Sequence, residues 1–154
     1  MVRIKIRKSN AIKACEIVGC NSVEFLGLQD NKLDSIDLLE IVKKVEHFID
    51  LHKPLKVFTH YGDDLNIDHQ IVNQAVVTAC RPQPGFSVKE LYFFEIPSST
   101  EWGLKKMFNP NCFIDISNTL HLKIDALKMY KNELKEFPHP RSIKSIEALA
   151  IKRG

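Results

Sequence analysis

Helix-like and strand-like patterns alternate along this chain, and this alternation constrains its fold more than any other feature. Apolar residues spaced three or four apart predict a helix that begins at Asp34 or Ser35 and ends before Pro54. The apolar run 55–59 then predicts a buried strand, and a further helix follows a polar loop. Because a crossover helix is the ordinary way to join parallel strands, we predict an α/β layer fold with a mostly parallel sheet.

The same patterns predict the remaining elements. They are a helix capped by Ser9 and stopped by Gly19, a strand at 22–26, a helix from Asp68 or just before it, strands at 88–96 and 113–116, a helix capped by Ser117, and a final helix of about 142–152. At 154 residues with 44% hydrophobic content, the chain is expected to form one domain, residues 1–154.

Charge and hydropathy exclude several classes of function. A net charge of +3, from 22 basic and 19 acidic residues, is too small an excess to predict nucleic-acid binding. The one dense basic cluster lies near the start, between Arg3 and Lys8, where we interpret it as a solvated chain end. No apolar run is long enough to span a membrane, and the charged first residues are not followed by an apolar region of the secretory kind. We therefore expect a soluble, cytoplasmic protein.

The four cysteines are Cys15, Cys20, Cys80 and Cys112, and only the first two lie near each other in the sequence. None shows the close paired spacing of a structural zinc knuckle. We expect them to be reduced, buried, small apolar residues.

The segment Thr59–His69 is the strongest candidate for chemistry. Its eleven residues include two imidazoles, His60 and His69, and three carboxylates. These are the ligand types of a catalytic zinc that keeps one position open. From the residues alone, the favoured alternative is a solvated turn in which Asp68 is a helix N-cap and His69 a partly exposed first-turn residue.

The predicted fold brings this segment close to a second one. Ligands of open α/β sheets bind at the carboxyl ends of the strands. His60 ends one predicted strand, Asp68 and His69 begin the next helix, and the polar segment 97–102 follows another strand. We therefore expect these three groups to meet at one edge of the sheet.

Six further segments occur in a characteristic order: Val57–His60, Asp64–His69, Ala79–Pro82, Phe94–Trp102, Phe113–Ile116 and Phe137–Ser142. Together they resemble the LmbE-like branch of the PIG-L deacetylases, and the resemblance covers nearly the whole chain. The resemblance implies a Rossmann-like three-layer fold with a mostly parallel sheet. It also implies a zinc-dependent amidohydrolase that removes the acetyl group from N-acetylglucosamine-type or related N-acyl amino sugars.

One segment of the family pattern does not occur in these 154 residues. In the family, the first strand ends in Ala-His-Pro-Asp-Asp-Glu, which supplies two zinc ligands and the general base. Family members also usually continue into a further strand beyond the position of Gly154. We therefore expect a deacetylase that is shortened at both ends, lacks the first strand, binds zinc weakly and is inactive or nearly so alone; a natural compact variant is the alternative. An uncovered sheet edge also predicts oligomers or aggregation.

The resemblance assigns roles to residues of the central segment. His69 matches the zinc histidine and Asp68 the carboxylate that supports it. Asn66 stands where many relatives carry a histidine; it can donate a hydrogen bond to an oxyanion but cannot transfer a proton. His60 is then the nearest candidate for the general acid. Asp63 and Asp64 are expected to be ordinary loop carboxylates.

The second segment is expected to bind the sugar. Glu95, Ser98, Ser99 and Trp102 resemble a family segment that lines the cleft, where the indole would stack on the apolar face of a sugar. The alternative is a polar turn anchored by one aromatic residue. Arg141 either faces an anionic part of the substrate or, as we slightly favour, stabilises the start of the final helix.

Two other classes of function remain for comparison. A non-catalytic α/β module that binds sugar or a protein partner is the alternative to a deacetylase. A nucleotide-binding Rossmann domain is disfavoured because no Gly-x-Gly-x-x-Gly turn follows any predicted strand.

Overall fold

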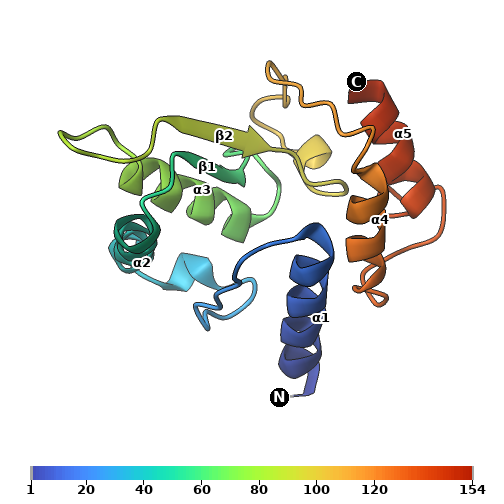
Figure 1. The fold of residues 1–154 in the computed structure, drawn as a ribbon, viewed down its shortest axis with the longest axis horizontal. Coiled ribbons are helices and arrows are strands. Elements are labelled where there is room, and N and C mark those ends of the chain that lie inside the picture. The colour runs from blue at the N-terminus through green and yellow to red at the C-terminus, as the bar shows by residue number, and fades with distance from the viewer. Residues whose placement is uncertain (1, 154) are drawn as a thin grey trace. The chain divides into compact units, whose positions relative to one another are not determined.

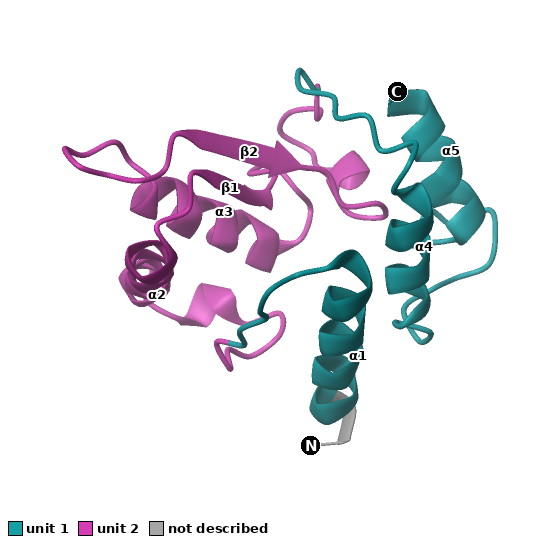
Figure 2. Ribbon diagram, in the orientation of Figure 1, with its two compact units in different colours: residues 1–25, 110–154 teal, residues 26–109 magenta. Residues whose placement is uncertain are grey.

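The computed structural model describes the backbone of residues 2–153 and the side chains of residues 4–153. Its elements, in chain order, are α1 (Val2–Val18), the 3-10 helix η1 (Leu33–Ser35), α2 (Leu38–His52), β1 (Lys56–His60), α3 (Ile67–Ala79), β2 (Glu90–Phe94), the 3-10 helix η2 (Thr100–Trp102), α4 (Leu120–Lys128) and α5 (Ile143–Arg153) (Figure 1). The chain forms two compact units (Figure 2): residues 26–109, and residues 1–25 together with 110–154. That the whole chain is one domain stays a prediction.

The unit of residues 26–109 contains the sheet. Strands β1 and β2 pair in parallel, with Lys56 opposite Glu90 and His60 opposite Phe94. Helix α3 joins the two strands, as the parallel geometry requires. The predicted α/β class with a parallel sheet is therefore confirmed, and the carboxyl ends of both strands lie at the same edge.

The core of this unit lies between η1, α2 and α3. It contains the buried residues Leu33, Ile41, Val42, Ile49, Ala75 and Ala79. The apolar positions of α2 recur every three or four residues, so that one stripe of the helix faces this core. The helix ends where predicted: Lys53 adopts a left-handed conformation and donates its N–H to Ile49 O at 2.8 Å, just before Pro54.

The other unit consists of α1, α4, α5 and the segments that connect them. Helix α4 packs against both α1 and α5, and Ile124, Ala126 and Ile146 are buried there. Glu133 forms ion pairs with Arg7 at 3.2 Å and with Arg141 at 3.6 Å.

Four predicted element features are wrong. Helix α1 begins at Val2 and continues through Ser9, so this serine is not a cap. Segments 22–26 and 113–116 are not strands in the described structure, because an apolar run becomes a strand only where a neighbour completes its hydrogen bonds. Helix α4 has Thr119 rather than Ser117 at its N-cap, since Ser117 is bonded to Asp115 instead.

The cysteine prediction is half right. All four thiols are free, but Cys20 and Cys112 are exposed, and Cys15 and Cys80 are only partly buried. Cys20 and Cys112 lie outside the helices, where no packed face covers their thiols. Among the described residues, none of the helices has the length and apolar character needed to cross a membrane.

Candidate active site

Two loops meet at the carboxyl edge of the sheet. The loop after β1 runs from Tyr61 to the start of α3, and the loop after β2 leads into η2. Tyr61 N–H donates to Phe94 O at 3.1 Å, and Leu65 N–H donates to Ser99 O at 3.4 Å. The structure thus confirms that the Thr59–His69 segment and the segment after β2 come together.

Asp64 is the centre of this meeting point. Only 1% of its surface is exposed. Its carboxylate accepts hydrogen bonds from the Ser99 hydroxyl, from Thr100 Oγ1 at 2.6 Å and from Asn66 N–H at 2.8 Å. Burial raises the pKa of Asp64, but these hydrogen bonds and the nearby His69 outweigh burial and lower it below the ordinary value. The carboxylate is therefore ionised at neutral pH.

Asp64 also orients His69. The Nδ1 atom of His69 lies 3.0 Å from Asp64 Oδ1. An ionised carboxylate only accepts hydrogen bonds, so Nδ1 carries a hydrogen, and in the uncharged tautomer of this ring Nε2 keeps its lone pair. A carboxylate that holds one ring nitrogen while the other is left for an ion is the usual outer support of a metal-binding histidine.

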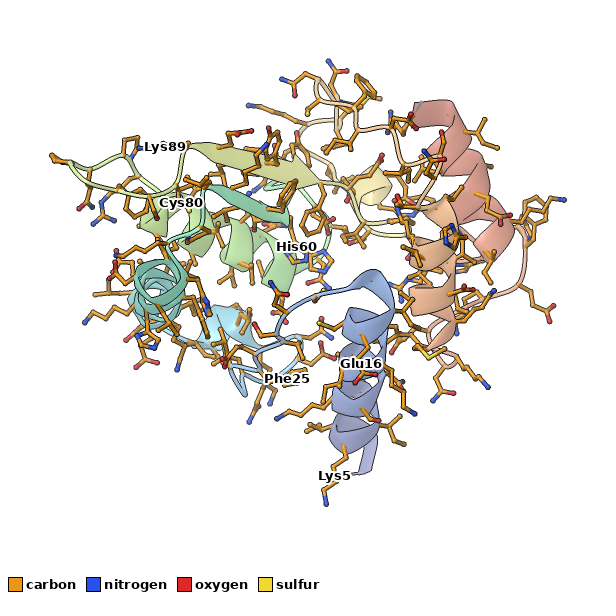
Figure 3. The ribbon with its side chains drawn as sticks, viewed as in Figure 1. Lys5, Glu16, Phe25, His60, Cys80 and Lys89 are labelled. Atoms are coloured by element: carbon orange, nitrogen blue, oxygen red, sulfur yellow. The ribbon has the colours of Figure 1, made fainter. Side chains whose placement is uncertain are left out.

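His60 lies at the end of β1 (Figure 3). Its ring stacks on that of His69. The ring centroids are 4.2 Å apart and the planes differ by 15°. Burial, and secondarily the charge of His69, lower the pKa of His60 to about 4, although Asp64 opposes this shift. At neutral pH His60 is therefore uncharged, which disfavours it as a ready proton donor. Its buried Nδ1 has no hydrogen-bond partner among the described residues.

Asn66 and Asp68 hold the start of α3. Asn66 Oδ1 accepts from Asp68 N–H at 2.8 Å and from His69 N–H at 3.4 Å, so Asn66 is the N-cap. The Asp68 carboxylate accepts from Asn31 N–H at 2.6 Å and from Leu33 N–H at 3.1 Å. Asp68 therefore ties the η1 segment to α3, and the N-cap interpretation of Asp68 is wrong.

The interpretation of Asp64 as an ordinary loop carboxylate is also wrong. The carboxylate in contact with His69 is Asp64, five positions earlier, rather than the adjacent Asp68. One signal was available: an aspartate two residues before a helix cap commonly bonds the backbone N–H two residues on, as Asp64 does with Asn66. The contacts with Ser99 and Thr100 had no signal in the local sequence.

Asn73 is a second residue that sequence reasoning missed. It is buried on α3, and its Nδ2 donates to His60 O at 2.7 Å. A Cβ atom at Gly62 would lie 2.8 Å from Asn73 Oδ1, so a larger residue there would require the Asn73 side chain to move. Asn73 thus fixes the position of the His60 backbone carbonyl.

The predicted sugar segment forms a tight turn. Glu101 accepts from Ser98 N–H at 2.7 Å and from Ser99 N–H at 3.1 Å, and Ser98 has a positive φ of 69°. The hydroxyl of Ser99 is used by Asp64, whereas Trp102 is 61% exposed and is therefore not a packed anchor of the turn. Glu95 lies just after β2, partly buried. The sugar-binding roles of Glu95, Ser98, Ser99 and Trp102 stay predictions.

Arg141 belongs to the other unit. Besides its ion pair with Glu133, its N–H donates to His139 Nδ1 at 3.0 Å, and its carbonyl accepts from Lys135 N–H at 3.4 Å. These contacts lie in the segment between α4 and α5. A stabilising role at the start of the final helix and a contact with substrate both stay predictions.

The described residues do not supply a complete zinc site. No group of three or more His, Cys, Asp or Glu residues within the described part of the chain could hold a metal ion. Zinc binds an imidazole nitrogen in the plane of the ring, at about 2.0–2.1 Å. The rings of His60 and His69 are stacked face to face, so they cannot both direct a nitrogen at one ion. Three donors converge on Asp64 Oδ1 and a fourth on Oδ2. One oriented nitrogen, Nε2 of His69, is therefore what these residues offer.

Comparison with known proteins identifies the family of this chain. A family model described as "PIG-L: GlcNAc-PI de-N-acetylase" matches residues 2–80, about half of the chain, and the chain belongs to the PIG-L family. The predicted family is therefore confirmed.

Two similar proteins bear the name probable N-acetyl-alpha-D-glucosaminyl L-malate deacetylase 2. The one from Bacillus cereus is 26% identical over 151 residues, which cover 96% of this chain and 67% of that protein. The one from Bacillus subtilis is 25% identical over 129 residues, which cover 83% of this chain and 57% of that protein. The chain thus spans about three-fifths of the length of these relatives.

Proposed function

We propose that this chain forms one side of a deacetylase site for N-acetylglucosamine-type or related N-acyl amino sugars, in which His69 is a metal-binding imidazole. The observation that carries the proposal is the 3.0 Å contact between His69 Nδ1 and the buried Asp64, which leaves Nε2 with a lone pair at the carboxyl edge of the sheet. The family match and the names of the Bacillus relatives support the reaction type.

Zinc is the metal that the resemblance implies. A catalytic zinc has three protein ligands, and the described residues offer only one. We therefore expect the chain alone to bind zinc weakly and to show little or no activity. Metal analysis of the purified chain after dialysis against a metal-free buffer tests this; one tightly held zinc ion per chain would contradict it.

The reaction itself is tested with a chimera. A first βα unit that carries the family's His-Pro-Asp-Asp segment is placed before Met1, and acetate release is measured with N-acetylglucosaminyl malate and added zinc. We expect activity that falls at least about a hundredfold in His69→Ala, because a metal ligand is removed. His121→Ala, on the exposed face of α4, is the matched control and should keep full activity. A folded, zinc-loaded chimera without activity, or equal activity in the two variants, would refute the proposal.

The second candidate is a sugar-binding module without catalysis. The exposed indole of Trp102, next to the Ser98–Glu101 turn, favours it, since a stacked aromatic ring binds sugars without a metal. Calorimetric titration with N-acetylglucosamine in the presence of a chelator distinguishes the two. Binding that Trp102→Ala abolishes and His69→Ala leaves unchanged would favour the module.

A further inference from the structure

The end of α1 has a defined hydrogen-bond pattern. Gly19 adopts a left-handed conformation with φ of 77°, its N–H donates to Glu16 O at 3.2 Å, and Cys20 N–H donates to Cys15 O at 2.9 Å. These two bonds, with a left-handed residue between the helix and its exit, form a Schellman motif. A Cβ atom at Gly19 would meet nothing within 4 Å, so glycine is needed here for its conformation rather than for space.

This motif places two thiols together. The residues whose side chains meet across a Schellman motif are the ones joined by its longer hydrogen bond, here Cys15 and Cys20. Cys15 Sγ also donates to Ser22 O at 3.6 Å, and a hydrogen bond with the Cys20 thiol, followed by partial burial, raises the pKa of Cys15. Both thiols are free, and Cys20 is exposed.

The backbone holds the two residues within the reach of a disulfide. The Cα atom of Cys20 is one bond from the donating nitrogen, and the Cα atom of Cys15 is two bonds from the accepting oxygen. With 2.9 Å between these two atoms, the Cα atoms lie less than about 7 Å apart, which is the upper limit for a disulfide. The cap therefore holds the pair close in the folded chain.

We propose that Cys15 and Cys20 form a redox modification site, which closes to an intramolecular disulfide by exchange with a small-molecule disulfide such as glutathione disulfide. The exposed Cys20 thiolate attacks one sulfur of glutathione disulfide, and one glutathione thiolate leaves. The Cys15 thiolate then attacks the Cys20 sulfur of the mixed disulfide, and the second glutathione leaves. The two protons lost by the cysteines end on the two glutathione molecules, so that the protein is oxidised and glutathione disulfide is reduced.

The Cys15–Cys20 disulfide would link the last turn of α1 covalently to the residue that follows Gly19. The disulfide would join the same two residues that the hydrogen bond of the cap joins, so the left-handed turn at Gly19 would become part of a small ring. Neither cysteine belongs to the Asp64–His69 cluster, so this proposal does not depend on the proposed deacetylase function.

The test uses the whole chain, incubated with glutathione disulfide, alkylated and digested with trypsin. Both cysteines lie in one tryptic peptide, residues 14–32, so closure appears as the loss of two hydrogens from that peptide without added glutathione. We expect closure to be about tenfold or more faster in the folded chain than in urea, because the cap raises the effective concentration of one thiol at the other. The exposed Cys112, in another peptide, should stop at the mixed disulfide.

Two variants test the roles of the second thiol and of the helix cap. Cys15→Ser should leave Cys20 at the mixed disulfide, and Gly19→Ala, which strains the left-handed position, should slow closure in the folded chain toward its rate in urea. Circular dichroism of each variant shows whether the helices remain. Equal closure rates in the folded wild-type chain and in urea would overturn the proposal. So would accumulation of a mixed disulfide at Cys20 of the folded wild-type chain, as at Cys112.

Discussion

Replacing Asp64 with alanine should remove a large part of the folding free energy of this chain. The carboxylate is almost fully buried and accepts four hydrogen bonds, of which two come from hydroxyls that can rotate toward other acceptors. The other two, from Asn66 N–H and from His69 Nδ1, have fixed directions and would lose their acceptor. Each buried donor without a partner costs about 1–3 kcal/mol, so we expect a loss of about 2–6 kcal/mol.

Asp64→Asn separates the hydrogen bonds from the charge. The amide oxygen can keep the bonds made to Oδ1, but its NH2 group then faces Thr100 Oγ1, which already accepts from Ile96 N–H at 2.6 Å. We expect an intermediate loss of about 1–3 kcal/mol, because one bond must rearrange and the charge assistance is lost.

Urea unfolding followed by far-ultraviolet circular dichroism measures these losses at neutral pH. Asp63→Ala is the matched control: its neighbouring, only partly buried carboxylate should contribute less than about 0.5 kcal/mol. Because the pKa of Asp64 is lowered in the folded state, its stabilising effect is present above its unfolded pKa and is lost as the pH falls through the folded value. Asp64→Asn should therefore show a weaker loss of stability below about pH 4. If Asp64→Ala and Asp63→Ala were equally stable, the central role given to Asp64 would be wrong.

Three further predictions concern neighbouring residues. His60, with its pKa lowered to about 4, binds fewer protons folded than unfolded, so stability should fall as the pH drops from about 6.5 to 4, and His60→Phe should weaken this dependence in urea titrations across that range. Gly103→Ala should destabilise the chain by more than about 1 kcal/mol in the same titration, because the new Cβ would lie 2.1 Å from the Asp63 carbonyl oxygen. Asn66→Ala should cost about 1 kcal/mol through loss of the α3 cap, whereas Asn66→Asp, which can still cap, should cost less in thermal unfolding.

The sequence was most informative where local patterns determine structure. The stripe on α2, the glycine stop after α1 and the apolar strand before His60 all depend on spacing within a few residues, and the structure confirms them. Segments 22–26 and 113–116 have equally apolar sequences but no ladder partner among the described residues, and pairing is not visible in a local pattern.

The site shows the same limit. The approach of His60 to His69 followed from the strand order and the rule for carboxyl ends of strands. Which carboxylate contacts His69, that of Asp64 or that of Asp68, could not be predicted in this way. It depends on the hydroxyls of Ser99 and Thr100, which follow β2 and are distant from Asp64 in the sequence. Adjacency in sequence favoured Asp68, but the helix start directs its carboxylate toward Asn31 and Leu33 instead.

The long sequence separation within the Asp64 cluster has a consequence for the order of folding. Asp64 bonds residues that are 35 and 36 positions away, whereas the cap of α3 joins residues only two or three apart. Closing a long loop costs entropy before the contacts across it contribute free energy. Helix α3 can therefore form early, whereas the Asp64 cluster can form only once β2 has paired with β1. We expect Asp64 variants to speed unfolding while hardly changing the folding rate, so that His69 acquires its final orientation among the last events as the chain folds.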